Sequence, residues 1–138
     1  AGKGRFEEIE SARNEPDTER SLRRLGMAYL LLVTRPDIIA MNRLIIGEAG
    51  RQPQLSRIFY ENGARQTLLS ICIVIESLMA RGLLRKAEVR QTGLYFKALC
   101  EAGLVERQLW GLDQAPSEEV CEAAVDKAIE VFLPAFRP

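Results

Sequence analysis

The chain has 138 residues, with 19 Lys and Arg against 19 Asp and Glu, no His, three Cys and 47% hydrophobic residues. A chain of this length folds as one domain that buries about two thirds of the surface its unfolded form exposes. The absence of His excludes Ser-His-Asp and Cys-His nucleophile pairs, as well as zinc and di-iron sites that contain His. A net charge of zero gives no overall field that would attract nucleic acid or an anionic membrane.

The cysteines and the polar N-terminus indicate a cytoplasmic protein. Cys72, Cys100 and Cys121 are far apart and have apolar or alanine-rich neighbours, which predicts reduced thiols packed as small hydrophobes. The N-terminal AGKGRFEEIE does not resemble a signal peptide. The longest apolar run, residues 68–75, is much shorter than the about 20 residues that span a bilayer. We therefore expect a soluble, cytoplasmic protein with no membrane partner.

Proline and glycine divide the sequence into segments with helical periodicity. Pro36 ends one such segment at Arg35, because the residue before a proline is forced out of the helical conformation. Alternating runs of β-branched and aromatic residues are absent, so no strand is predicted. The sequence predicts an all-α domain of about six helices, over residues 6–12, 16–35, 36–50, 53–82, 86–102 and 115–136, with a helical turn over 104–111.

The predicted helix over residues 53–82 is the longest and the most apolar. Around residues 71–75 it is apolar on all sides, which places it at the centre of the domain. One of its faces combines apolar residues with a polar interruption near the middle. That face consists of Leu55, Ile58, Phe59, Asn62, Gln66, Leu69, Ile73 and Glu76.

Two carboxylates have apolar sequence neighbours and are candidates for ligand contacts. Glu48 is either such a contact or the partner of Arg43 or Arg51 at the edge of the core. Glu76 is either a polar group of a pocket or a member of a structural ion pair, because an unpaired buried carboxylate is costly. The sequence has no Glu-x-x-His pair and no Gly-rich phosphate loop, so we expect no metal site, no cofactor and no catalytic residue.

Adaptable and small side chains suggest two kinds of binding surface. Methionine and aromatic residues fill irregular space, and they either line a cavity for an apolar molecule or simply pack the core. Small residues in the last two helices allow close helix approach and indicate a self-association face. The first set is Met27, Met41, Met79, Phe59, Tyr60, Tyr95 and Trp110, and the second is Gly93, Ala98, Ala102, Gly103, Ala123, Ala124 and Ala128.

The order of these segments resembles the C-terminal regulatory domain of TetR/AcrR-type transcriptional repressors. Three stretches carry the resemblance: RLIIGEAGRQPQLSRIFYENG (43–63), GLLRKAEVRQTGLYFKALCEAGLVERQLWG (82–111) and AAVDKAIEVFLPAF (123–136). In that family the first stretch frames an effector pocket. The other two resemble the last two long helices, which pair with those of a second subunit as a four-helix bundle. The resemblance covers about residues 6–136.

The resemblance also implies a division of the chain. Residues 1–15 correspond to the helix that connects to the DNA-binding head, and residues 16–138 to the regulatory ligand-binding and dimerisation domain. The family's N-terminal helix-turn-helix has no counterpart ahead of Phe6. Binding to operator DNA is therefore implied only through a helix-turn-helix missing from this chain.

The leading hypothesis is the effector-sensing domain of a homodimeric TetR-type repressor. An apolar or aromatic small molecule would enter between the second, third, fourth and fifth helices and alter DNA binding. The predicted pocket residues are Met27, Leu31, Met41, Leu44, Phe59, Asn62, Gln66 and Trp110. The predicted dimer-interface residues are Phe96, Leu99, Gly103, Ala124, Ala128 and Phe132.

Two other classes of protein remain as alternatives. The first is a stand-alone helical carrier or adaptor that binds a small molecule without any role at DNA. The second and weaker one is an enzyme that works without His, for which Cys100 is the thiol to test.

Overall fold

The computed structural model describes residues 2–138, and their side chains from Glu7 onward. Over that range the chain contains helices and no strands, which confirms the predicted all-α fold. The first helix is longer than predicted, since it begins at Gly2 and ends at Asn14. The elements are α1 (Gly2–Asn14), α2 (Thr18–Val33), α3 (Pro36–Glu48), α4 (Pro53–Phe59), the π-helical turn η1 (Tyr60–Ala64), α5 (Arg65–Ala80), α6 (Val89–Glu101), α7 (Leu104–Leu109) and α8 (Glu118–Phe136).

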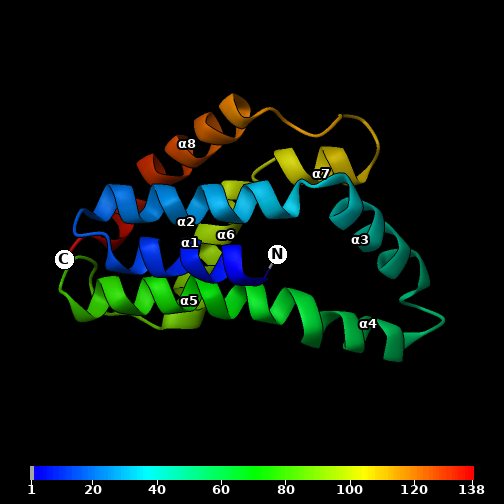
Figure 1. Cartoon of the computed structure of the whole chain (residues 1–138), viewed down its shortest axis with the longest axis horizontal. Helices are drawn as coiled ribbons and strands as arrows, with labels where there is room; N and C mark the ends of the chain where they lie inside the picture. Colours follow the sequence, from blue (N-terminus) through cyan, green and yellow to red (C-terminus); the bar gives the residue numbers. More distant parts are fainter. Residues whose placement is uncertain (1) are drawn as a thin grey trace.

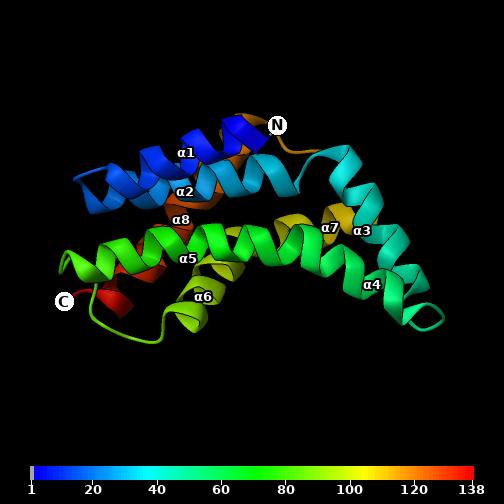
Figure 2. The same ribbon diagram turned by 60° about the horizontal axis from the view of Figure 1, so that its bottom comes forward.

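The helices form a bundle with an arm at one end. Helices α1, α2 and α5 lie side by side, and α6 and α8 pack against them to complete what we call the bundle (Figure 1). Helices α3 and α4, residues 36–59, extend from one end of α2 and return to α5, and we call them the arm (Figure 2). Helix α7 lies beside α3, where the arm meets the bundle.

Local sequence signals explain where several helices begin and end. The carboxylate of Asp17 accepts a hydrogen bond from the Arg20 backbone N–H at 2.9 Å, and so caps the start of α2. Pro36 and Pro53 occupy the first turns of α3 and α4, where a missing N–H costs nothing. Gly103, with φ of 75°, takes the left-handed conformation that separates α6 from α7.

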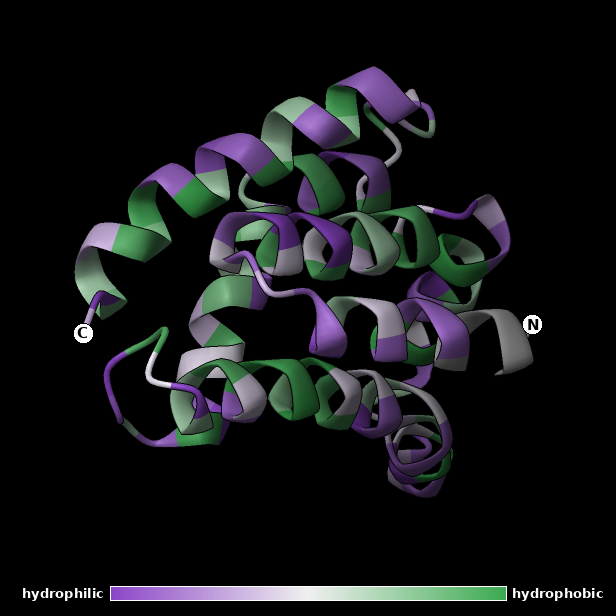
Figure 3. Ribbon diagram, turned by 60° about the vertical axis from the view of Figure 1, so that its left-hand side comes forward, coloured by the Kyte–Doolittle hydropathy of each residue, from purple (hydrophilic) through white to green (hydrophobic). Residues whose placement is uncertain are grey.

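Apolar stripes of the bundle helices meet in one core. In α5 the residues Ile71, Val74 and Ile75 are buried, as predicted for the centre of the domain, whereas Ile73 is 45% exposed. The segment is therefore not enclosed on all sides. Along the C-terminal helix, hydrophobic and hydrophilic residues alternate around the axis, as expected for a helix with one buried face (Figure 3). Aromatic rings fill the core between α6 and α8. The ring centres of Phe96 and Phe132 lie 5.2 Å apart, and the rings meet edge to face.

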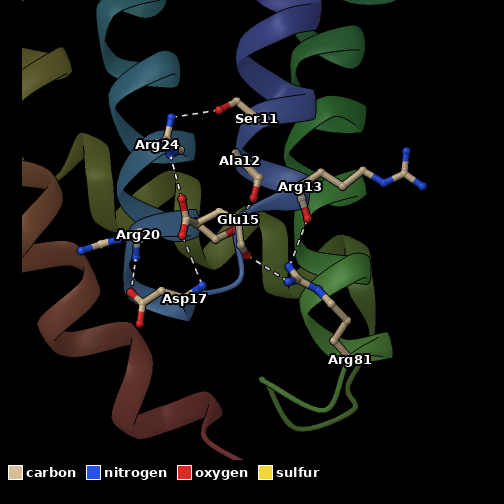
Figure 4. A network of polar contacts seen from close by, with 9 residues as sticks. Ser11, Ala12, Arg13, Glu15, Asp17, Arg20, Arg24 and Arg81 are labelled. Carbon is tan, nitrogen blue, oxygen red and sulfur yellow. Dashed lines mark hydrogen bonds and ion pairs between the residues drawn. The ribbon is translucent and has the colours of Figure 1, made fainter.

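The C-terminal end of α1 is tied to its neighbours by polar contacts (Figure 4). The hydroxyl of Ser21 on α2 donates a hydrogen bond to the carbonyl of Ala12 at 2.7 Å. The guanidinium of Arg81, just after α5, donates to the carbonyls of Arg13 and Glu15 at 3.1 and 2.9 Å. These donors satisfy carbonyl groups that a helix end leaves unpaired. They hold α1 against both α2 and α5.

The predicted helix over 53–82 is continuous, but it contains the π-helical turn η1. A π turn holds one more residue than an α turn, so the side chains after it are rotated by about 100° relative to a regular α-helix. The face predicted for this helix is therefore broken. Before the turn, Leu55 and Phe59 are half-buried and Ile58 is exposed. Within and after it, all the predicted residues are exposed, namely Asn62, Gln66, Leu69, Ile73 and Glu76.

The two candidate carboxylates have different surroundings. Glu76 is exposed, which corrects the prediction that it lies in an apolar environment as a pocket contact or structural ion pair. Glu48 forms an ion pair with Arg51 at 2.5 Å, and this was one of the two predicted partners. Arg43, the other candidate, makes different contacts, described below.

The helical segment Pro53–Ala80 has 28 residues and is long and apolar enough to cross a membrane, judged by length and composition alone. Core helices of soluble proteins meet the same criterion. In this segment Val74, Ile75 and Leu78 are fully buried among the other helices. The criterion is therefore weak evidence for a membrane span.

Candidate functional site: a cavity between the bundle and the arm

A cavity of about 240 Å³ lies where the arm meets the bundle. Most of its wall is apolar, and it draws residues from α2, α3, α4, η1, α5, α6 and α7. A concave, mostly apolar space with a few polar groups is typical of a small-molecule site. The lining residues are Tyr29, Leu32, Val33, Ile38, Asn42, Phe59, Gly63, Ala64, Thr67, Lys97, Glu101, Val105 and Leu109.

The π-helical turn forms one wall of the cavity. Gly63 and Ala64 belong to this turn, and their small side chains leave the space open. Apart from its chain neighbours and the backbone of its own helix, a Cβ atom at Gly63 would have no atom within 4 Å. Thr67, one turn later, donates a hydrogen bond from its hydroxyl to the Gly63 carbonyl at 3.3 Å. The extra residue of the turn thus directs Gly63 and Thr67 toward the cavity and Asn62 and Gln66 toward solvent.

Three polar side chains form a cluster on the bundle side of the cavity. Glu101 Oε2 accepts hydrogen bonds from the Tyr29 hydroxyl at 2.5 Å and from Lys97 Nζ at 2.7 Å. Lys97 Nζ also lies 5.6 Å from the centre of the Tyr29 ring, within the range of a cation–π contact. Burial, and then the nearby Glu101 carboxylate, raise the pKa of Tyr29 well above its usual range, so the phenol keeps its proton and acts as the donor.

Hydrogen bonds from one arginine and one glutamine join the helices around the cavity. The Arg43 guanidinium on α3 donates hydrogen bonds to the carbonyls of Leu109 and Gln108 on α7, at 2.8 and 2.6 Å. The buried Gln108 side chain in turn donates from Nε2 to the carbonyl of Thr34 at the end of α2, at 2.7 Å. These contacts hold α3, α7 and α2 together around the cavity.

Of the eight predicted pocket residues, the structure places only Phe59 in the wall of this cavity. Met27 and Leu31 line a separate groove of about 210 Å³ between α1 and α2. The other five are exposed at the surface, and Trp110 is 71% exposed. These five are Met41, Leu44, Asn62, Gln66 and Trp110.

The physical reasons why the predicted pocket residues lie outside the cavity differ between helices. On α3 the buried residues are Ile39 and Ile45, while Met41 and Leu44 lie on the outward side. On α5 the displacement follows from the π turn, which a regular helical period does not anticipate. Apolar periodicity alone does not decide which side of a helix faces the domain when both sides carry apolar residues.

The polar cluster was not predicted from the sequence, for a different reason. Lys97 and Glu101 are four residues apart on α6, a spacing that normally indicates a solvated surface pair. Tyr29 comes from α2, 72 positions away from Glu101 in the sequence. Only the packing of α2 against α6 brings the three together. The available signal was that Lys97 and Glu101 stand within and directly after the mostly apolar residues 94–100 of α6.

The predicted dimer-interface residues occupy two different layers. Phe96, Ala128 and Phe132 are buried in the core of the single chain, while Leu99 and Ala124 are half-buried and Gly103 is exposed. The outer surface of α6 and α8 carries a shallow apolar groove of about 420 Å³. Its lining includes two of the predicted residues, and consists of Tyr95, Ala98, Leu99, Val131, Phe132, Ala135 and Phe136.

The thiol considered for chemistry has an unfavourable environment. Cys100 is buried, and this burial, followed by the nearby Glu101 carboxylate, raises its pKa to about 12. At neutral pH it therefore stays a thiol, which is a poor nucleophile. Cys72 and Cys121 are also free, and burial raises the pKa of each.

Comparisons with known proteins agree with this architecture. Residues 20–138 match the family described as the C-terminal domain of AefR-like transcriptional repressors. None of the curated protein sequences matches the chain. Among solved structures, a candidate TetR-family transcriptional regulator from Mesorhizobium loti superposes with a TM-score of 0.89 over 99% of this chain and 67% of that one, at 20% identity.

Two further solved structures are similar. The flavonoid-responsive regulator FrrA gives a TM-score of 0.77 at 26% identity, with 99% of this chain and 72% of that chain covered. A TetR transcriptional regulator from Agrobacterium tumefaciens gives 0.72 at 25% identity, with 88% and 60% covered. This chain thus spans between 60% and 72% of the length of the three solved chains.

Proposed function

We propose that this chain senses a small apolar effector and dimerises. The premise is its family: the chain belongs to the TetR-type, AefR-like transcriptional repressors, whose C-terminal domain it matches. Residues 16–138 would carry both tasks, and residues 1–15 would connect them to a helix-turn-helix outside this chain. Effector binding would shift the position of the connecting helix and alter binding to operator DNA. Such a regulator acts in the cytoplasm.

The observation that carries this proposal is the cavity between bundle and arm. It touches seven helical elements, so a molecule that fills it contacts both halves of the domain. A ligand shifts a conformational equilibrium only if it contacts the two states differently. A site between an arm and a bundle meets that condition better than a site within either part. The similarity to a flavonoid-responsive regulator supports an aromatic effector.

Two adjacent residues of α2 provide a matched test of the cavity. Leu32 lines the cavity, while Leu31 is 44% exposed on another side of the same helix. We expect Leu32→Trp to fill the cavity and abolish binding of phenylnaphthylamine, a neutral probe whose fluorescence rises in apolar sites. Leu31→Trp should leave this binding unchanged. If both variants bind the probe as the unmodified chain does, the cavity is not the binding site.

Dimerisation is supported by the groove on α6 and α8. Tyr95 is 52% exposed and Val131 59% exposed there, and large apolar residues grouped at a surface mark an interaction site. Two copies of this face would form a four-helix bundle. Val131→Glu should therefore yield a monomer in sedimentation experiments. Ile73→Glu, at a 45% exposed position of α5, is the control that should remain dimeric.

A further inference from the structure

The polar cluster in the cavity has hydrogen-bonding capacity that the protein does not use. Both bonds that Glu101 accepts, from Tyr29 and Lys97, end on Oε2. In the part of the chain that the structure describes, Oε1 accepts no bond from a protein donor. An ammonium group has three N–H donors, and Lys97 directs one of them to Glu101. The cluster therefore offers one acceptor and further donors to a molecule in the cavity.

The charges of the cluster cancel. Lys97 and Glu101 form an ion pair at 2.7 Å and are each less than one third exposed. A ligand carboxylate near this pair would be repelled by Glu101, and a ligand ammonium by Lys97. A neutral group that both donates and accepts a hydrogen bond suits it best. A hydroxyl has this combination on a single atom.

We propose that the effector is a neutral molecule with an apolar body and a terminal hydroxyl, of the phenol type, whose oxygen accepts from Lys97 and whose proton is donated to Glu101 Oε1. This inference rests on the proposed function, because it names the ligand class of the same cavity. Leu32, Ile38 and Phe59 supply the apolar wall for the body of the molecule. Tyr29 is a positioning residue, since it holds the Glu101 carboxylate through Oε2.

The preference arises from the cost of leaving a buried polar group without a partner. An ether in place of the hydroxyl accepts from Lys97 but cannot donate to Glu101. A site made to bind a hydroxyl rejects an analogue that lacks it, because the protein group is then desolvated and unpaired. Hydrogen bonds to charged groups are strong enough to change affinity by about tenfold or more.

Four probes of nearly equal size test this inference by calorimetry at neutral pH. They are para-phenylphenol, its methyl ether para-methoxybiphenyl, the anion para-phenylbenzoate and the cation para-phenylbenzylammonium. The phenol should bind about tenfold more tightly than each of the other three. Equal or tighter binding of the ether, the anion or the cation overturns the inference.

A charge-neutralising variant gives the sharpest readout. In Glu101→Gln the acceptor loses its charge and Lys97 is left as a net cation beside the cavity. The phenol should then bind about tenfold more weakly, and the benzoate should gain affinity and become the preferred probe. Glu106→Gln removes the same charge from an exposed position on α7 and should leave the order of affinities unchanged. Tyr29→Phe should weaken the phenol and leave the ether unchanged.

The outcomes separate this inference from the proposed function. If Glu101→Gln behaves like Glu106→Gln, the cluster does not recognise the ligand, whereas binding of phenylnaphthylamine would still support the cavity as the effector site. If none of the four probes binds while phenylnaphthylamine does, the hydroxyl assignment alone fails. If phenylnaphthylamine fails to bind as well, the cavity is not an effector site and both proposals fail. Circular dichroism of each variant establishes that it is folded.

Discussion

The bundle and the arm differ in how much apolar surface they bury. Helix α8 of the bundle buries seven of its residues, from Cys121 to Phe136, and α2 buries six. In the arm, α3 buries only Ile39 and Ile45, and α4 buries none. Hydrophobic burial is the main source of stability, so the bundle must hold the fold while the arm depends on it.

This difference explains why the cavity lies between them. A weakly buried part opens at a lower free energy than the core, and binding elements are drawn from such parts. The arm contains many exposed apolar side chains, among them Met41, Leu44 and Ile46. It is held by the burial of Ile39 and Ile45, by the Arg43 contacts to α7 and by its continuity with α2 and α5. A molecule in the cavity would add contacts where the arm has few.

The largest expected effect is in the core of the bundle. Phe132 is 1% exposed and packs against Phe96 and Phe136. Phe132→Ala should lower the free energy of unfolding by about 3–5 kcal/mol, through lost burial and a residual cavity. In the arm Ile46, which is 64% exposed, should tolerate Ala with a change of about 0.5 kcal/mol or less. Urea unfolding followed by circular dichroism compares the two, and equal losses would remove the distinction between bundle and arm.

Replacing a glycine by alanine should lower stability in the bundle and raise it in the arm. At Gly26 in α2 a Cβ would lie 2.7 Å from Val125 Cγ1 on α8, so Gly26→Ala should destabilise the bundle by about 1–3 kcal/mol. At Gly47 in α3 a Cβ would meet no atom within 4 Å, and Ala favours the helix there by roughly 0.5–1 kcal/mol. The melting temperature should fall for the first variant and rise for the second. A fall of similar size in both would show that the arm is packed as tightly as the bundle.

Loss of the Arg43 contacts should speed amide exchange in the arm and leave the bundle unchanged. Arg43→Met removes the two hydrogen bonds to the carbonyls of Leu109 and Gln108. Bonds from a charged donor contribute about 1.5–3 kcal/mol, and the exposure of Arg43 reduces this, so amides of α3 should exchange with solvent about tenfold faster. Amides of α2 and α8 should keep their exchange rates. Faster exchange throughout the chain would mean that arm and bundle unfold together.

Helix limits and the centre of the bundle were predictable from the sequence, whereas the cavity between bundle and arm was less so. Helix limits near Pro36, Pro53 and Gly82 agree with the structure within a few residues, because proline and glycine act through their own backbone geometry. The centre of the domain at Ile71 and Ile75 was also predictable, since a strongly apolar segment must be buried. These features depend on local chemistry or on total hydrophobicity.

The cavity wall was less predictable because it depends on register and on distant contacts. The π turn at Tyr60–Ala64 shifts the face of α5 by one residue, which no periodicity rule indicates. Phe59, before the turn, was placed in the cavity wall by both sequence and structure, whereas Asn62 and Gln66, within and after it, face solvent. Tyr29 and Glu101 meet only through tertiary packing. Phe132 is buried in the chain's own core and also lines the groove on α6 and α8, so its role at a dimer interface stays a prediction.

The smallest expected effect concerns two exposed ion pairs, one at the start of the arm and one at α7 beside it. Hydrogen bonds from the Arg35 and Arg107 guanidinium groups lower the pKa values of Asp37 and Asp113, respectively, below the usual 3.8. Because the folded-state pKa is lowered, each carboxylate stabilises the fold fully above its usual pKa, and this contribution is lost as the pH falls through the folded-state value. In an NMR titration of the carboxyl carbons, Arg107→Gln should raise the midpoint of Asp113 toward 3.8 and leave that of Asp37 in place. Added salt should reduce both shifts, since exposed charges are screened. A midpoint of Asp113 that stays low in the variant would mean that the carboxylate is stabilised by the backbone around it and not by the arginine, and the surface next to the arm would then be more rigidly organised than its low burial indicates.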